Sequence, residues 1–208
     1  MLRAMSVFLL ACIAAVAQYK LEATGAPPED LDPAIRQILA PSGHRILRGD
    51  GSVYCEIWFR ASAPSGAPTS EQNVSLTTVP HGALLGAIRF LVRGQDRRGQ
   101  PILPGVYTLR LSFFPPDGNH QGVAPQRDFL LLIPAAEDKD PNATPSYAEV
   151  VAMSKKTTKG GHPAILSLWK DDSGRAPSLV QEGESDWVLY TKVGDLPIGV
   201  ILIGVYTG

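Results

Sequence analysis

The chain has 208 residues, of which 44% are hydrophobic and 19% are charged, and its formal net charge at pH 7 is -1. A protein that binds nucleic acid usually carries an excess of positive charge to contact the phosphates. This chain is nearly neutral, so we do not expect it to bind nucleic acid. Its 20 glycines and 18 prolines favour short strands joined by many turns over a helical bundle.

The first 17 residues have the pattern of a signal peptide. A positive start at Arg3 precedes an apolar run over residues 4–14, and residues 15–17 form an A-x-A cleavage signal. We therefore expect cleavage after Ala17 and a secreted or periplasmic protein. The apolar run is too short for a stable anchor, and no transmembrane span is expected in the mature chain.

A lipoprotein is the alternative for this end of the chain. Residues 9–12 loosely match a lipoprotein box, which would acylate Cys12. The apolar run continues past Cys12 and a better cleavage site follows, so cleavage after Ala17 is favoured. Cys55 is then the one remaining cysteine, and no internal disulfide is expected. Its alternation with Val53 and Ile57 predicts a small buried hydrophobe rather than a nucleophile.

The first half of the mature chain predicts one helix and several strands. Residues 18–31 form a polar lead-in, and a short helix begins with Asp32 as N-cap and Pro33 in its first turn. A β-hairpin follows over residues 45–59, since its glycine-rich turn tolerates positive φ. Further on, the pattern predicts a surface loop over residues 61–73, a strand over residues 84–92 with Leu84, Ile88, Phe90 and Val92 on one face, and a charged turn over residues 93–100.

The second half centres on a strand predicted over residues 104–113. Its apolar positions, from Tyr107 to Phe113, alternate with Thr108, Arg110 and Ser112, which is typical of a sheet with one wet face. The remaining elements are a strand over residues 129–133 covered on both faces, a helix capped by Thr144 with Pro145 in its first turn, and strands over residues 164–169, 187–193 and 199–206.

These elements predict a mainly β fold. Eight or nine strands and two short helices, joined mostly by turns, favour a single antiparallel β-sandwich domain, jelly-roll-like, over residues 18–208. If the apolar final strand lies at a sheet edge, it would favour self-association.

The loop over residues 115–126 is the main candidate site, because long loops in compact domains are often functional. It contains Asp117, Asn119 and His120, and the next strand begins with Arg127 and Asp128. One interpretation is a simple turn, with Asp128 paired to Arg127 or Arg110. The other is the site of a hydrolase or metal-dependent enzyme, although the calcium-loop carboxylates and paired-histidine spacings are missing. We predict no metal and no cofactor.

A second candidate lies on the first hairpin. Tyr54, Glu56 and Trp58 alternate along one strand, and an acidic residue between two aromatic rings could bind a sugar by stacking. An edge-strand glutamate beside half-buried aromatics is the plainer alternative. We expect Trp169 and Trp187 to pack in the core.

Five segments carry a resemblance to other proteins. They read APPEDLDPAI, VYCEIWFR, PGVYTLRLSFFPPDGNHQGVAPQRDFLLL, GHPAILSLW and DLPIGVILIG. In these segments, which are spread along the mature chain, the sequence resembles a group of uncharacterised secreted proteins from environmental bacteria of the acidobacterial type. The resemblance implies export and a sandwich fold, and it implies no catalytic residues.

The first functional hypothesis is an exported, non-catalytic binding or envelope-associated module. Its partner would be a glycan or another envelope protein, by analogy of fold class alone. The second hypothesis is the enzyme with its site at residues 115–128.

Overall fold

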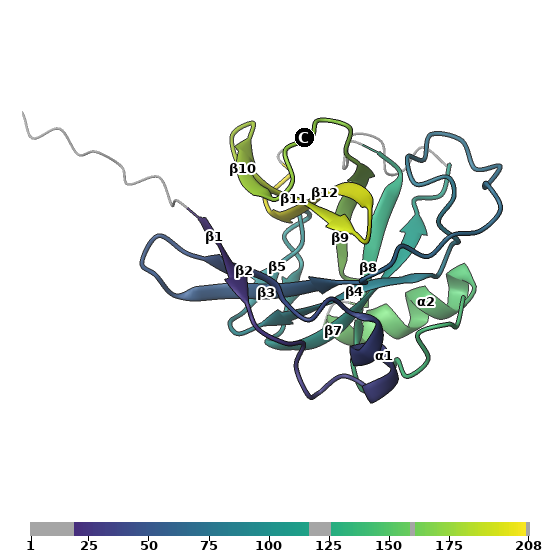
Figure 1. Cartoon of the computed structure of the whole chain (residues 1–208), viewed down its shortest axis with the longest axis horizontal. Coiled ribbons are helices and arrows are strands. Elements are labelled where there is room, and N and C mark those ends of the chain that lie inside the picture. The colour runs from purple at the N-terminus through teal and green to yellow at the C-terminus, as the bar shows by residue number, and fades with distance from the viewer. Residues whose placement is uncertain (1–18, 117–125, 159–160, 207–208) are drawn as a thin grey trace, which may run out of the picture.

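The computed structural model describes residues 19–116, 126–158 and 161–206, and it shows a mainly β protein (Figure 1). Ten strands form one antiparallel sheet in the order β1-β2-β3-β4-β7-β8-β9-β12-β11-β10, and β5 and β6 form a separate small hairpin. The twelve strands are Lys20–Thr24, Gly43–Leu47, Val53–Phe59, Leu84–Phe90, Gly94–Gln95, Pro101–Ile102, Gly105–Phe113, Asp128–Pro134, Ile165–Lys170, Ser178–Glu182, Asp186–Val193 and Leu196–Ile203.

The sheet curls until its two edge strands meet, so that it nearly closes into a barrel. Side chains join the two ends of the sheet: the ring of Tyr19, just before β1, stacks edge to face on that of Trp187 in β11, with centroids 5.4 Å apart. On the neighbouring strands, His44 Nε2 lies 2.8 Å from Thr191 Oγ1. The curl therefore encloses a single interior.

The connectivity differs from that of a jelly roll. From β1 to β9 the large sheet is a simple meander, and only the order β9-β12-β11-β10 forms a Greek key, whereas a jelly roll has two. The apolar final strand, β12, lies between β9 and β11. It does not form the sheet edge on which the prediction of self-association depended.

Apolar side chains from nearly every long strand fill the interior. Tyr107, Leu109, Leu111 and Phe113 of β7 point inward as their alternation predicts, and Cys55 is fully buried among them. Burial also raises the pKa of the Cys55 thiol, which keeps it protonated. The prediction that this cysteine is a small buried hydrophobe is confirmed.

The opposite face of β7 is dry, and the prediction of a wet face was wrong. Thr108, Arg110 and Ser112 are each 0% exposed. The segment after β8 folds back over this face and carries helix α2, Tyr147–Ser154, which packs on β8. Polar residues on a strand face are compatible with burial when each finds a hydrogen-bond partner.

Arg110 is held by an extensive set of polar contacts. Its Nε and Nη2 atoms donate to the two carboxylate oxygens of Asp138, both at 2.7 Å. The remaining N–H groups donate to the carbonyl oxygens of Gly82, Asp140 and Ala143. Arg110 thus fastens two loops to β7: the one before β4 and the one between β8 and α2. The expected pairing of Arg110 with Asp128 is wrong.

The two helices begin close to their predicted positions. Asp32 caps helix α1, Pro33–Ile38, by accepting from the backbone N–H of Ala34, as predicted. Helix α2 is capped by Ser146 rather than Thr144, because Ser146 and Glu149 form a reciprocal capping box.

Four strands were not predicted: β1, β10 and the β5–β6 hairpin. β1 comes from the polar lead-in and has mostly exposed residues, so it lacks the apolar alternation of a strand. Strand β4 also differs from its prediction. A register shift between Leu84 and Gly86 turns Leu84 away from the interior, toward α1.

Among the residues described, no helix is both long and apolar enough to cross a membrane.

We expect the substitution D138N to destabilise the fold by about 3 kcal/mol, because it leaves the buried Arg110 guanidinium without its counter-charge. The neighbouring substitution E137Q is a matched control, since Glu137 pairs with Lys156 in an exposed ion pair. It should change the free energy of unfolding by less than about 0.5 kcal/mol. Urea denaturation measures both, and equal effects would contradict the role given to Arg110.

Candidate functional site

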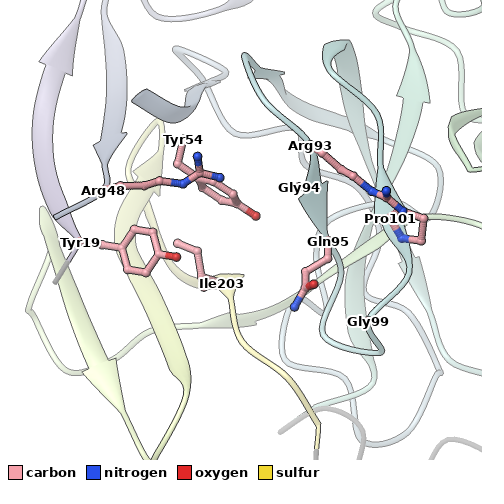
Figure 2. Close-up of a pocket in the computed structure, with 9 residues that line it drawn as sticks. All are labelled: Tyr19, Arg48, Tyr54, Arg93, Gly94, Gln95, Gly99, Pro101 and Ile203. Atoms are coloured by element: carbon pink, nitrogen blue, oxygen red, sulfur yellow. The ribbon is translucent and has the colours of Figure 1, made fainter. Parts of the chain in front are cut away.

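The candidate site is a hollow at one end of the curled sheet, which we call the mouth pocket (Figure 2). Its volume is about 410 Å³, within the usual range for small-ligand sites. It lies where the β2–β3 turn, the residue before β1, the end of β12 and the β5–β6 hairpin come together. Its lining residues are Tyr19, Arg48, Tyr54, Arg93, Gly94, Gln95, Gly99, Pro101 and Ile203.

A row of aromatic rings connects the mouth pocket to the core. Tyr19 stacks edge to face on Tyr54 at 5.9 Å, Tyr54 on Phe90 at 5.6 Å, and Phe90 on Tyr107 at 6.4 Å. Edge-to-face contacts at these distances favour defined ring orientations. The two tyrosines that line the pocket are therefore held in place by the interior packing.

The hairpin on the other side of the pocket is organised by Asp96, which is 1% exposed. Its Oδ1 accepts from the backbone N–H groups of Arg98 and Gln100, each at 3.0 Å. Its Oδ2 accepts from the guanidinium of Arg98, also at 3.0 Å. A carboxylate with this many donors fixes a tight turn, so the hairpin presents Arg93 and Gln95 on a rigid support.

Gly94 lets the hairpin lie close against the aromatic row. A Cβ at this position would be 2.6 Å from Cε1 of Phe90 and 3.2 Å from the hydroxyl of Tyr54. Any larger residue would force the hairpin away from the rings. The shape of the pocket thus depends on a glycine here.

The charge of the mouth pocket is positive. Of the described residues that line it, two are arginines and none is acidic. Neither arginine forms an ion pair within this part of the chain. The guanidinium carbon of Arg48 lies 5.2 Å from the centre of the Tyr54 ring. Burial raises the pKa of the Tyr54 phenol, so its hydroxyl stays protonated. Together these groups offer donors to an anionic ligand.

Figure 2 shows how the groups are arranged. Arg48, Tyr19 and Tyr54 lie together on one side, with the tyrosine hydroxyls directed toward the hairpin. Gln95 extends into the space from the opposite side, and Arg93 runs along the hairpin toward Pro101. A ligand in the pocket would be contacted by aromatic rings on one side and by the hairpin on the other.

The residues predicted from the sequence fall in several places. Asp117, Asn119 and His120 lie outside the described residues. Asp128 is fully buried and accepts from the backbone N–H groups of Ser75 and Leu76 at 2.8 and 2.9 Å. Its carboxylate therefore holds a loop, and its expected pairing with Arg127 is wrong.

Arg127 belongs to another hollow, at the base of the 115–126 loop. Its Nη2 donates to Glu71 at 3.0 Å and its Nε donates to the carbonyl of Phe114 at 2.7 Å. The hollow has a volume of about 540 Å³ and includes His81. His81 Nε2 lies 3.0 Å from Ser112 Oγ, but Ser112 is 0% exposed. Burial lowers the pKa of His81. This serine–histidine contact lacks an accessible nucleophile.

Glu56 and Trp58 do not form an open stacking surface with Tyr54. Glu56 and Trp58 are each 1% exposed, and Trp58 Nε1 donates to the carbonyl of Gly25 at 2.7 Å. The Glu56 carboxylate accepts from Thr24, Arg45 and Arg89. Burial alone would raise its pKa, but these hydrogen bonds and charges outweigh burial and hold the pKa below its usual range. Of the three residues, Tyr54 alone reaches the mouth pocket.

Within residues 19–116, 126–158 and 161–206, no three histidine, cysteine, aspartate or glutamate side chains gather as metal ligands.

Comparisons with protein families, with curated proteins and with solved structures found no match for this chain.

We expect the substitution G94A to destabilise the protein by about 1–3 kcal/mol, because the added methyl group overlaps Phe90. It should also increase the solvent exposure of Tyr54, which hydroxyl-radical labelling of this residue, read out by mass spectrometry, measures. G25A is the control, since a Cβ at Gly25 meets nothing within 4 Å. Equal labelling of Tyr54 in both variants would show that the hairpin does not depend on Gly94.

Proposed function

We propose that the protein is an exported, non-catalytic binding protein whose mouth pocket holds an acidic saccharide. The observation that carries this proposal is the lining of the pocket: two arginines and two tyrosines, without a carboxylate. Guanidinium groups bind carboxylates through paired N–H donors, and tyrosine rings pack against the C–H faces of sugars. A uronic acid presents both features in one residue.

The size and rigidity of the pocket support a small ligand. A volume of about 410 Å³ suits one or two sugar units. Tyr19 and Tyr54 are held by ring packing, and the hairpin that carries Gln95 is held by Asp96. Little side-chain freedom has to be lost on binding, which favours affinity.

Export is supported by the sequence of residues 1–17, with cleavage after Ala17 rather than acylation at Cys12. A protein outside the cytoplasm meets glycans of cell walls and of the surrounding medium, so a glycan is favoured over another envelope protein as partner. We also infer that the curled sheet works as an open β-sandwich scaffold, since β1 and β10 touch without pairing with each other.

The proposal predicts that the mature chain binds trigalacturonate in isothermal titration calorimetry, and that R48Q weakens the affinity about tenfold to a hundredfold. This range corresponds to one charge-assisted hydrogen-bond pair of roughly 1.5–3 kcal/mol. R93Q should have a smaller effect in the same direction, since Arg93 runs along the hairpin toward Pro101. Raising the salt to about 0.5 M should weaken binding by screening.

R36Q is the matched control, because it removes an equal charge from helix α1, which does not line the pocket. Galactotriose, which has the same size and no carboxylate, should bind much more weakly than trigalacturonate. If R36Q and R48Q weaken binding equally, or if galactotriose binds as tightly, the mouth pocket is not a site for acidic sugars.

A further inference from the structure

A further hollow lies on the outer face of the sheet, over strands β9, β12, β11 and β10. These strands form the upper part of Figure 1. We call it the outer hollow, and its volume is about 280 Å³. Its floor is apolar, because Val188, Tyr190 and Ile201 form a buried cluster there. Its lining residues are Gln126, Trp169, Arg175, Glu182, Asp186, Val188, Tyr190 and Ile201.

Trp169 forms a flat wall of this hollow. It pairs directly with Gly199 of β12, and a Cβ on Gly199 would be only 2.6 Å from Cε2 of the indole. The ring therefore occupies the space that a side chain at position 199 would take. One side of the indole is supported by the glycine backbone, while the residue remains partly exposed and lines the hollow.

The polar groups beside Trp169 are held in fixed positions. The guanidinium carbon of Arg175 lies 3.9 Å from the centre of the Tyr190 ring. Arg175 also donates to the Tyr190 hydroxyl and to Oε1 of Glu182, both at 2.7 Å. The Tyr190 hydroxyl in turn donates to the Glu182 carboxylate. A planar cation and a planar carboxylate are thus arranged next to the indole.

The lining of the outer hollow differs in charge from that of the mouth pocket. Its described lining residues include two carboxylates, Glu182 and Asp186, and one arginine, Arg175. Both carboxylates are paired, Asp186 with Arg97 at 2.8 Å and Glu182 with Arg175. The hollow therefore offers no excess of cationic groups to an anionic ligand, which favours a neutral one.

We infer that the outer hollow is a second saccharide-binding site, specific for a neutral sugar. A single supported indole offers a surface for the C–H face of a pyranose ring. The fixed carboxylate of Glu182 and the guanidinium of Arg175 can accept from and donate to adjacent sugar hydroxyls. A cage for a quaternary ammonium ion would need two open aromatic faces, but Arg175 already covers the ring of Tyr190.

The test titrates the mature chain with neutral tetrasaccharides, namely cellotetraose, xylotetraose, maltotetraose and chitotetraose, by calorimetry. At least one should bind, and W169L should weaken that affinity at least about tenfold, whereas W169F should retain part of it. Y147L is the matched control, because it removes an aromatic ring that is 45% exposed on helix α2, and it should leave the affinity unchanged. W169L should also leave trigalacturonate binding intact, which separates this inference from the proposal for the mouth pocket.

NMR of the unmodified chain tests the same inference without a substitution, so it applies even if W169L does not fold. The sugar should shift the indole N–H resonance of Trp169 and leave that of Trp58, which is 1% exposed, in place. The inference is overturned if none of the four sugars binds, if the Trp169 resonance does not move, or if Y147L and W169L weaken binding equally. Binding of tetramethylammonium in place of the sugars would overturn it as well.

Discussion

The apolar interior of the curled sheet is the constraint on which the rest of the structure depends. Inward side chains from strands across the sheet fill it, up to the ring of Tyr54 at one end. Accessible polar side chains therefore lie at the ends of the curled sheet and on its outer face. The mouth pocket lies on the last aromatic ring of the core, and the outer hollow lies on the outer face of strands β9 to β12, whose inner face packs in the core. Both candidate sites use the packed interior as their support.

The alternation of β7 predicted the strand and its inward face correctly, but it could not predict what covers the other face. Thr108, Arg110 and Ser112 look the same in a sequence whether they meet water or buried partners. Their environment is decided by Asp138 and by carbonyl groups 28–33 residues away along the chain. Such contacts form only once the segment after β8 folds back, and no local pattern encodes them.

The candidate sites also depend on long-range contacts that a local sequence pattern cannot predict. Among the predicted binding residues that the structure describes, Tyr54 alone lies in the mouth pocket. The sequence signal for it was an aromatic residue on a predicted strand. In the sequence, Arg48 belongs to a predicted hairpin and Gln95 to a predicted charged turn. The two residues come together only through a long-range contact between the β2–β3 turn and the β5–β6 hairpin, which no local pattern shows. Trp169 was expected in the core. It lies instead on the outer face of the sheet, where it packs against Val188, Tyr190 and Ile201 and stays partly exposed.

The most direct test of the central claim, that the mouth pocket binds an acidic sugar, is a titration of the ¹⁵N-labelled mature chain with trigalacturonate followed by amide chemical shifts. The amide resonances of Gly94, Gln95 and Ile203 should shift in a saturable way, because these residues line the mouth pocket. Shifts that gather instead around Arg127 and Tyr147, at the base of the 115–126 loop, would contradict the account, as would the absence of any saturable shift.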